Sequence, residues 1–158
     1  MCHNGHMKHT LEFETIIECT PERLFAFHAD TKNLPLITPP GTTVEILQLE
    51  ETLKQGNEAV LKIKKGFFSF VWKLVFEKVE PPHLIVDVAT QSPFKTFRHE
   101  HYFLRLDEFH TLLTDRVTFS LSFGVFNRPI VWFIKRDMKR MFNYRHQKTL
   151  EAIALEAP

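Results

Sequence analysis

Phe97-Arg98-His99-Glu100-His101-Tyr102-Phe103 is the stretch around which the fold of this chain is organised. Successive side chains of a β-strand point to opposite faces, so Phe97, His99, His101 and Phe103 share one face. Two imidazoles flanked by two phenyl rings are unusual for a core and suit the wall of a pocket. The stretch therefore predicts a strand whose inner face lines a binding site.

The predicted hairpin partner of this strand is Asp115-Arg116-Val117-Thr118-Phe119-Ser120-Leu121, which follows after a short loop. If Leu106 pairs with His110, then His101 lies opposite Asp115. A carboxylate beside an imidazole fixes its tautomer and raises its pKa, as in a general base. The pair is therefore our candidate catalytic pair. One alternative is a buried structural pair in which the two groups only satisfy each other's hydrogen-bonding capacity, and the other is a polar contact for a ligand.

The composition is that of one globular domain. The chain has 158 residues, of which 44% are hydrophobic and 25% charged, and a domain of this size can bury a sizeable core. Phenylalanine is unusually frequent, with 16 Phe against two Tyr and two Trp. So many rings without polar groups must pack in a core or line an apolar cavity.

Charge and cysteine content narrow the class of protein. The formal net charge is +1, which provides no field for nucleic-acid binding. Cys2 and Cys19 form no disulfide framework, so we expect a reducing, cytoplasmic location. No signal peptide and no apolar run long enough to cross a membrane is visible, so we expect no stable membrane insertion. The sequence is compatible with a homodimer.

The order of elements predicts an α+β fold. Residues 1–8 show no periodicity and are expected to be a disordered tail, and residues 9–155 one domain. Thr20-Pro21-Glu22 is typical of a helix start. A stripe of apolar residues from Ile130 to Ile153 predicts a long helix, capped by Asn127. The remaining segments are a short helical stretch at 31–36 and expected strands at 9–19, 43–49, 58–65, 68–77 and 84–91, together with the hairpin described above.

The most economical packing is a curved antiparallel sheet of about seven strands wrapped around the long C-terminal helix, with two short helices after the first strand and an internal cavity. Phe68, Phe70, Trp72, Leu74 and Phe76 fall on one face of a strand, which the helix must cover. We expect a ligand in the cavity. Its predicted contacts from the sheet are Trp72, Phe97, His99, His101, Phe103 and Phe119, and from the helix Met138, Met141 and Phe142.

Several local motifs, taken with this order of elements, resemble the SRPBCC superfamily, the START-like helix-grip group that includes polyketide cyclases and lipid-transfer domains. The similarity is greatest to uncharacterised bacterial ligand-binding SRPBCC proteins. Ser92 stands where that group has glycine, and Phe97 where it has tryptophan. The resemblance implies a hydrophobic cavity and no single chemistry. The segments that carry it are Ser92-Pro93-Phe94, residues 97–103, Asp115-Arg116-Val117, Asn33-Leu34, Ile37-Thr38-Pro39-Pro40, Phe123-Gly124 and Phe142-Asn143-Tyr144-Arg145.

A metal site is an alternative interpretation of the two imidazoles. His99 and His101 project to the same side of a strand, as two zinc ligands do. The candidates for a third ligand are Asp115, His28 and His146, and no recognisable spacing fixes any of them. The tail also carries Cys2, His3, His6 and His9, but a mobile segment provides no fixed geometry. We therefore expect neither a metal nor a cofactor.

The sequence predicts binding of a small hydrophobic or aromatic molecule, such as a lipid or polyketide, without catalysis. One alternative is a cyclase- or dehydratase-like enzyme that uses His101 and Asp115 for proton transfer. A second is a lipid or quinone carrier that docks on membranes through the basic face of the last helix, although such a face is usually just solvated. Arg145 is expected to face the sheet and to pair with Asp87 or Asp115.

Overall fold

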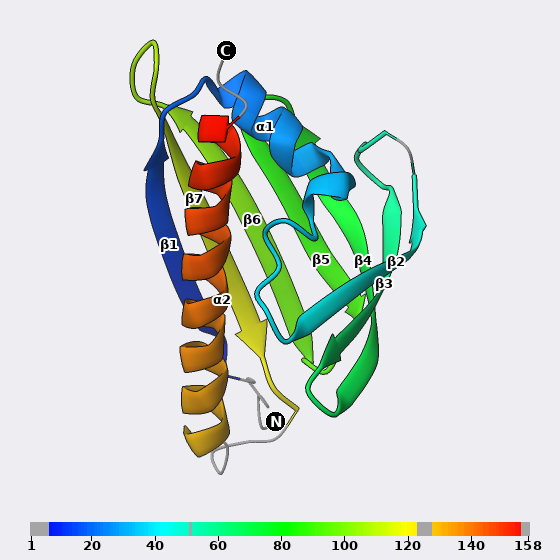
Figure 1. The fold of residues 1–158 in the computed structure, drawn as a ribbon. Coiled ribbons are helices and arrows are strands. Elements are labelled where there is room, and N and C mark those ends of the chain that lie inside the picture. The colour runs from blue at the N-terminus through cyan, green and yellow to red at the C-terminus, as the bar shows by residue number, and fades with distance from the viewer. Residues whose placement is uncertain (1–6, 51, 123–127, 156–158) are drawn as a thin grey trace, which may run out of the picture.

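The computed structural model describes residues 7–50, 52–122 and 128–155. Seven strands and two α-helices form, joined by one turn of 3-10 helix (Figure 1). The elements are β1 (His9–Ile17), α1 (Pro21–Ala29), η1 (Thr31–Asn33), β2 (Thr42–Leu49), β3 (Glu58–Lys65), β4 (Phe68–Glu80), β5 (Leu84–Gln91), β6 (Thr96–Arg105), β7 (Thr111–Ser120) and α2 (Arg128–Leu155).

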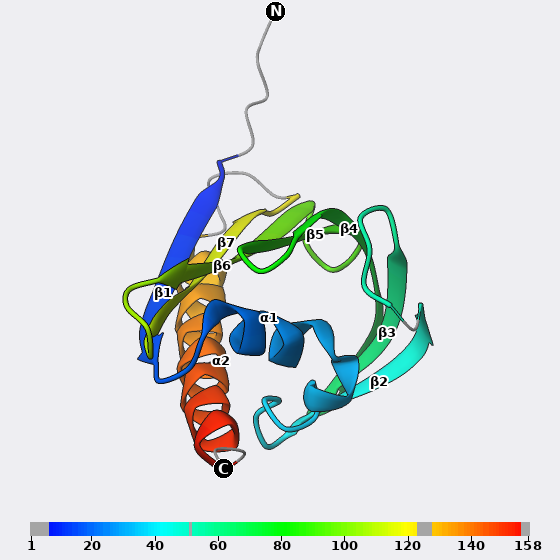
Figure 2. The same cartoon turned by 90° about the horizontal axis from the view of Figure 1, so that it is seen from above.

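All seven strands belong to one antiparallel sheet, in the order β1-β7-β6-β5-β4-β3-β2. Seen from above, the sheet curls so that β2 and β3 turn toward the side on which the helices lie (Figure 2). Register shifts at Ile46/Gln48 and within the β4–β5 pairing interrupt the ladders, and such bulges bend strands. The strongly curved antiparallel sheet predicted from the sequence is confirmed.

The two short elements after β1 start where the sequence indicates. The Thr20 hydroxyl caps α1 by accepting a hydrogen bond from the backbone N–H of Arg23, and Pro21 occupies the first turn. The second element is shorter than predicted: η1 ends at Asn33 rather than at residue 36. Pro35 lacks an N–H donor, so it interrupts the series of i→i+3 hydrogen bonds between the one from Leu34 N–H to the Thr31 oxygen and the one from Leu36 N–H to the Asn33 oxygen, which explains the early end.

Helix α2 runs along the β1 side of the concave face (Figures 1 and 2). Its length agrees with the prediction, while the proposed cap at Asn127 lies outside the described residues. The buried positions recur every three or four residues, which places them on one face. They are Met138, Phe142, His146, Thr149 and Ile153.

The core consists of two apolar clusters. One lies where α1 and the end of α2 meet the sheet and includes Leu24, Phe103 and Ile153. The other lies farther along α2 and includes Trp72 and Phe142. Phe142 stacks on Phe13 of β1 with 4.7 Å between ring centroids, so α2 is held against the sheet edge by aromatic packing.

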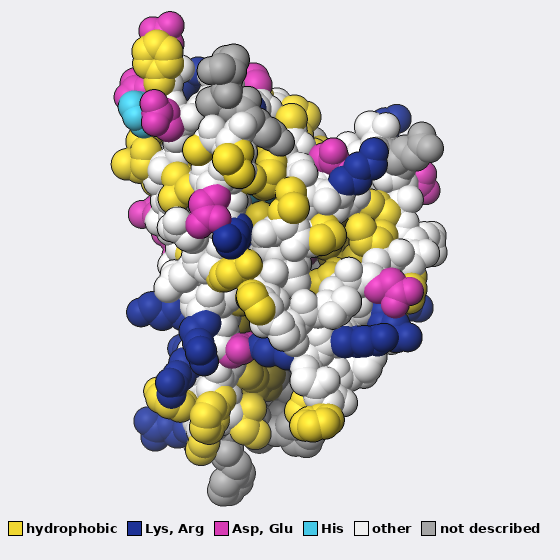
Figure 3. Space-filling model, in the orientation of Figure 1, with side chains coloured by type: hydrophobic (Ala, Val, Ile, Leu, Met, Phe, Trp, Pro, Cys, Tyr) yellow, Lys and Arg dark blue, Asp and Glu magenta, His cyan; other side chains and the backbone are white. Residues whose placement is uncertain are grey.

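The β2–β4 part of the sheet, which we call the open arm, has a different environment. Helix α2 packs chiefly against β1, and α1 against β6. Several apolar side chains of the open arm are consequently only half-buried, and Figure 3 shows apolar side chains in a recess between α2 and this arm. These half-buried residues are Leu61, Ile63, Phe70 and Phe76.

Within the described segments, neither helix has the combination of length and apolar character that crossing a bilayer requires.

Candidate functional site

The hairpin register predicted from the sequence is confirmed. In the β6–β7 ladder His101 pairs with Asp115, His99 with Val117 and Phe97 with Phe119. Both imidazoles and the carboxylate are buried, with exposed fractions of 5% for His99, 9% for His101 and 3% for Asp115. The polar groups of this hairpin therefore lie inside the molecule.

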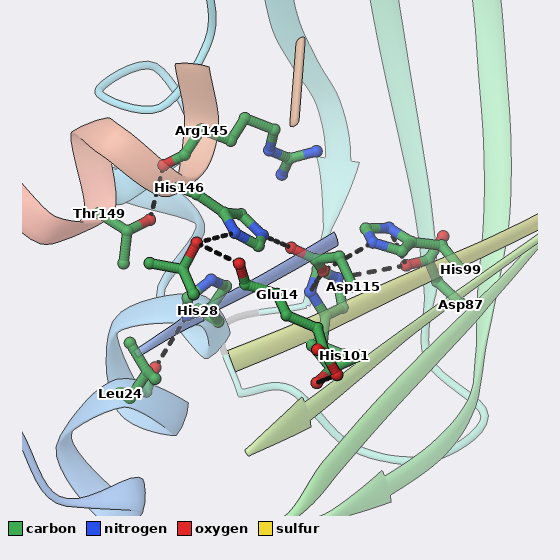
Figure 4. Close-up of polar contacts among 12 residues, drawn as sticks. Glu14, Leu24, His28, Asp87, His99, His101, Asp115, Arg145, His146 and Thr149 are labelled. Atoms are coloured by element: carbon green, nitrogen blue, oxygen red, sulfur yellow. Dashed lines mark hydrogen bonds and ion pairs between the residues drawn. The ribbon is translucent and has the colours of Figure 1, made fainter. Parts of the chain in front are cut away.

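Asp115 contacts three imidazoles at once (Figure 4). Its Oδ1 lies 2.9 Å from Nε2 of His99 and 2.6 Å from Nδ1 of His101, and its Oδ2 lies 2.6 Å from Nε2 of His146 on α2. The His101 ring is not turned for a well-aligned hydrogen bond, so its 2.6 Å approach to Oδ1 is a close polar contact. One carboxylate thus fixes the orientation of side chains from β6 and α2.

Two further imidazole nitrogens at this site contact oxygen atoms, one on β1 and one within α1. Nδ1 of His146 lies 2.7 Å from the Thr15 hydroxyl on β1. His28, on α1, has its Nδ1 2.9 Å from the Leu24 carbonyl oxygen, and its ring is 5.6 Å from that of His101. Strands β1, β6 and β7 and both helices therefore meet at this cluster.

Asp87 is a second buried carboxylate, on β5, with an exposed fraction of 8%. It pairs across the ladder with His99. Its Oδ2 lies 3.5 Å from Nδ1 of His99 and 3.8 Å from Nε2 of His101. Both distances are too long for hydrogen bonds, so Asp87 faces the side of the imidazoles that Asp115 does not contact.

The pKa values of these groups follow from burial and from the neighbouring charges. Burial raises the pKa of Asp87 to about 6 and lowers the pKa of His28 to about 3. It also lowers the pKa values of His99 and His101. Burial acts to raise the pKa of Asp115 as well, but the charge and hydrogen bonds of the surrounding imidazoles hold it well below its usual range.

Arg145 points from α2 toward the sheet, as predicted (Figure 4). The predicted ion pair is absent: within the described part of the chain, neither Asp87 nor Asp115 lies within ion-pair distance of its guanidinium. The group instead lies 5.5 Å above the Phe142 ring. Burial lowers the pKa of Arg145, while the charges of the two carboxylates act to raise it.

The aromatic residues predicted to contact a ligand pack against one another. The Trp72 and Phe97 rings meet edge to face at 4.8 Å, and Phe94 lies 5.2 Å from Phe97. Phe103 and Phe119 are fully buried. On α2, Met138 and Phe142 are buried and Met141 is half-buried. These rings form the floor of the concave face, and the accessible apolar surface lies on the open arm.

Three residues of the site have weaker signals in the sequence. The sequence offers Asp87 only as a partner of Arg145, although a carboxylate at an inward position of β5, opposite His99, marks a polar site. His146 was one of several possible ligands, and its place in the buried stripe of α2 was the available signal. Phe94 precedes β6 and has no periodic pattern that would place it.

Two surface hollows lie elsewhere. One, of about 410 Å³, runs between β1 and α2 and includes Thr15 and His146 in its lining. The other, of about 250 Å³, lies beside α1 and is lined by Cys19 and Phe109 among others. Neither is lined by His101 or Trp72. His146 lines the hollow between β1 and α2 and also contacts Asp115, so this hollow meets the site at His146.

A curved sheet gripping a long helix, with buried polar groups on the concave face, defines a helix-grip protein of the SRPBCC type. Residues 17–145 match the family model described as polyketide cyclase/dehydrase and lipid transport. The chain belongs to this family.

Solved structures share the fold at low sequence identity. The Zhui aromatase/cyclase from Streptomyces sp. R1128 is 16% identical, with a TM-score of 0.74 over 92% of this chain and 93% of that one. Norcoclaurine synthase from Thalictrum flavum, in complex with dopamine and hydroxybenzaldehyde, is 10% identical, with a TM-score of 0.74 over 97% and 90%. TTHA0849 from Thermus thermophilus is 14% identical, with a TM-score of 0.69 over 91% and 99%. A search of curated proteins gave no match.

Proposed function

We propose that this protein binds a small hydrophobic or aromatic molecule on the concave face of its sheet, without catalysing a reaction on it. The observation that carries the proposal is the half-buried apolar surface of the open arm, at Leu61, Ile63, Phe70 and Phe76. This surface adjoins the buried Trp72 cluster.

Apolar surface that stays in contact with water is energetically unfavourable. Burying such surface contributes roughly 25 cal/mol per Å², and in the described structure no helix covers the open arm as α2 covers β1. A ligand that lies between the open arm and α2 completes this burial. Met141 is half-buried on the facing side, and its flexible thioether can adapt to the shape of a ligand.

The polar end of the ligand would lie toward His101 and Asp115. These groups border the apolar floor, where the His101 ring lies 6.4 Å from and parallel to that of Phe103. A pocket with an apolar lining and a few placed polar groups is the usual form of a small-molecule site. The solved structure of norcoclaurine synthase holds dopamine and hydroxybenzaldehyde, which supports an aromatic ligand for this fold.

Two matched variants on β4 test the proposal. Phe70→Arg places a charge on the half-buried apolar surface, while Phe68→Arg places the same charge at a position that is 77% exposed. Binding of 2-naphthol and of oleic acid is followed by fluorescence of Trp72 in a Trp132→Phe background. We expect binding that is lost in Phe70→Arg and retained in Phe68→Arg. Equal binding in both variants, or no binding by the parent chain, would contradict the proposal.

A cyclase- or dehydratase-like reaction is the second candidate, and the contact between His101 and Asp115 favours it. A base must lie within reach of the proton it moves, and Asp115 holds one ring nitrogen of His101 while the other faces away. If the protein converts a bound polyketide-like substrate, His101→Ala should abolish conversion while binding persists. Conversion that survives in His101→Ala would exclude this role.

A further inference from the structure

Three atoms on the concave face converge on one point without bonding to one another. Asp87, His99 and His101 each offer one ligand atom within 4.8 Å of the other two, and Oδ2 of Asp87 faces Nδ1 of His99 and Nε2 of His101. The carboxylate oxygen is 3.5 Å from the first nitrogen and 3.8 Å from the second. All three side chains are buried.

The contacts with Asp115 determine whether the nitrogens that face Asp87 carry a proton or a lone pair. Nε2 of His99 is 2.9 Å from the Asp115 carboxylate, so in the neutral ring this nitrogen carries the proton. Nδ1 of His101 lies 2.6 Å from the same oxygen at an angle that is poor for a hydrogen bond; because a bare lone pair at this distance would repel the carboxylate, the proton of the neutral ring belongs on this nitrogen. The nitrogens that face Asp87 therefore carry lone pairs. Two lone pairs and a carboxylate directed at one point repel each other unless a cation lies between them.

We infer that Asp87, His99 and His101 bind a divalent transition-metal ion, with Zn²⁺ as the reference ion, and that Asp115 orients the two imidazoles from behind. Two histidines and one carboxylate are an established ligand set for zinc and for non-haem iron. The inference goes beyond hydrophobic-ligand binding and replaces the expectation that the protein holds no metal.

The distances fit a metal better than a hydrogen-bond network. Zinc lies about 2.0 to 2.2 Å from nitrogen and oxygen ligands, which puts neighbouring ligands of a tetrahedral site roughly 3.4 Å apart. The observed 3.5 and 3.8 Å are close to this spacing and beyond hydrogen-bond range. With the three ligand atoms within 4.8 Å of one another, the site would contract to close around an ion.

The contacts behind the two imidazoles and the local charge agree with this assignment. Metal-bound histidines usually donate their other N–H to a carboxylate, which orients the ring, and Asp115 lies in this position for both rings. Asp87 and Asp115 lie near the buried guanidinium of Arg145. When the imidazoles are neutral, the two carboxylates outnumber this positive charge by one, which attracts a cation to the site.

Two of the three proposed ligands are slightly more accessible than the groups behind them. The side chains of Asp87 and His101 keep 11% exposure each, more than those of His99 or Asp115. A fourth coordination position would therefore be reached from the accessible side of Asp87 and His101. Catalytic zinc sites have this form, with three protein ligands and one position for water or a ligand oxygen.

The first test is zinc stoichiometry in a chain without competing tail ligands. Cys2→Ser, His3→Ala and His6→Ala are combined in the full-length protein, which is stripped with EDTA, incubated with Zn²⁺ and separated by gel filtration. Elemental analysis should find about one zinc per chain, and Zn²⁺ should raise the melting temperature. Mg²⁺, which prefers oxygen ligands, should not bind.

Matched variants in the same background locate the site. Asp87→Asn keeps the shape of the side chain and should weaken zinc binding by at least about ten-fold, as should His101→Gln. His110→Gln removes the exposed imidazole that pairs with Asp107 and should change nothing. In the parent chain Co²⁺ should give visible absorption bands, which Asp87→Asn shifts or abolishes. Circular dichroism checks that each variant is folded.

Zinc-free protein after incubation, or unchanged affinity in folded Asp87→Asn and His101→Gln, would overturn the metal site. The result is independent of the proposed function, because binding of 2-naphthol is measured separately on EDTA-treated protein. Loss of naphthol binding with retained zinc would contradict the function alone. Loss of zinc with retained naphthol binding would contradict the metal site alone.

Discussion

The two ends of the sheet are built differently, although they belong to one continuous antiparallel ladder. At the β1 end, α2 covers the strands and the interior holds aromatic rings together with the Asp115 cluster. At the β2 end, neither described helix packs on the strands as α2 packs on β1, and apolar side chains are half-buried. We expect the covered end to supply most of the stability of the fold, and we propose the open arm as the surface on which a ligand binds.

Asp115→Ala should have the largest effect of any single change at the covered end. It removes the common partner of three buried imidazoles, and breaking a buried pair costs about 3 to 5 kcal/mol. Urea denaturation measures the free energy of unfolding. Asp107→Ala, which breaks the exposed pair with His110, is the control and should cost less than about 1 kcal/mol. Similar losses in the two variants would contradict the central role of Asp115.

Phe142→Ala should cost nearly as much, about 3 to 4 kcal/mol, because the ring is 1% exposed and stacks on Phe13. Phe70→Ala, on the open arm, should cost about 1 kcal/mol, because the side chain is only half-buried. The same denaturation experiment compares the two. A larger loss in Phe70→Ala would show that the open arm, and not the covered end, holds the fold together.

Hydrogen exchange should distinguish the two edge strands. Both β1 and β2 pair with a single neighbour, but α2 packs on β1. Backbone amides of β2 should therefore exchange by local opening at a free energy about 2 kcal/mol below that of β1. Equal protection of the two edges would mean that the open arm is as tightly held as the covered end.

The smallest effect on stability is expected at Lys65, whose ammonium pairs with Asp137 of α2. This ion pair links the open arm to the helix, and both side chains are about half exposed. Lys65→Ala should cost less than about 1 kcal/mol, as surface pairs generally do. If the pair restrains the arm, the variant should also release 2-naphthol faster in stopped-flow measurements, whereas Lys62→Ala should not.

Much of the fold could be predicted from the sequence because its signals are periodic. The alternation in β3 and β4 and the stripe of α2 fix elements whose bounds agree closely with prediction. The hairpin loop fixes the register that brings His101 to Asp115. The sequence predicts a helical stretch at 31–36, whereas η1 ends at Asn33 because Pro35 has no N–H with which to continue it.

The candidate site was less predictable because it depends on contacts between distant segments. Asp87 meets His99 through the β5–β6 pairing, and His146 meets Asp115 only because α2 folds back over β7. A single sequence contains no register between β5 and β6 as clear as that of a short hairpin. The Arg145 ion pair was wrong for a related reason, since a residue can face a carboxylate without reaching it.

The most direct test of ligand binding by the open arm is native mass spectrometry of freshly purified protein. The account predicts a complex with a small hydrophobic molecule, or one that forms on incubation with 2-naphthol or oleic acid, and its loss in Phe70→Arg but not in Phe68→Arg. A spectrum that shows only the mass of the free chain under all of these conditions would contradict it.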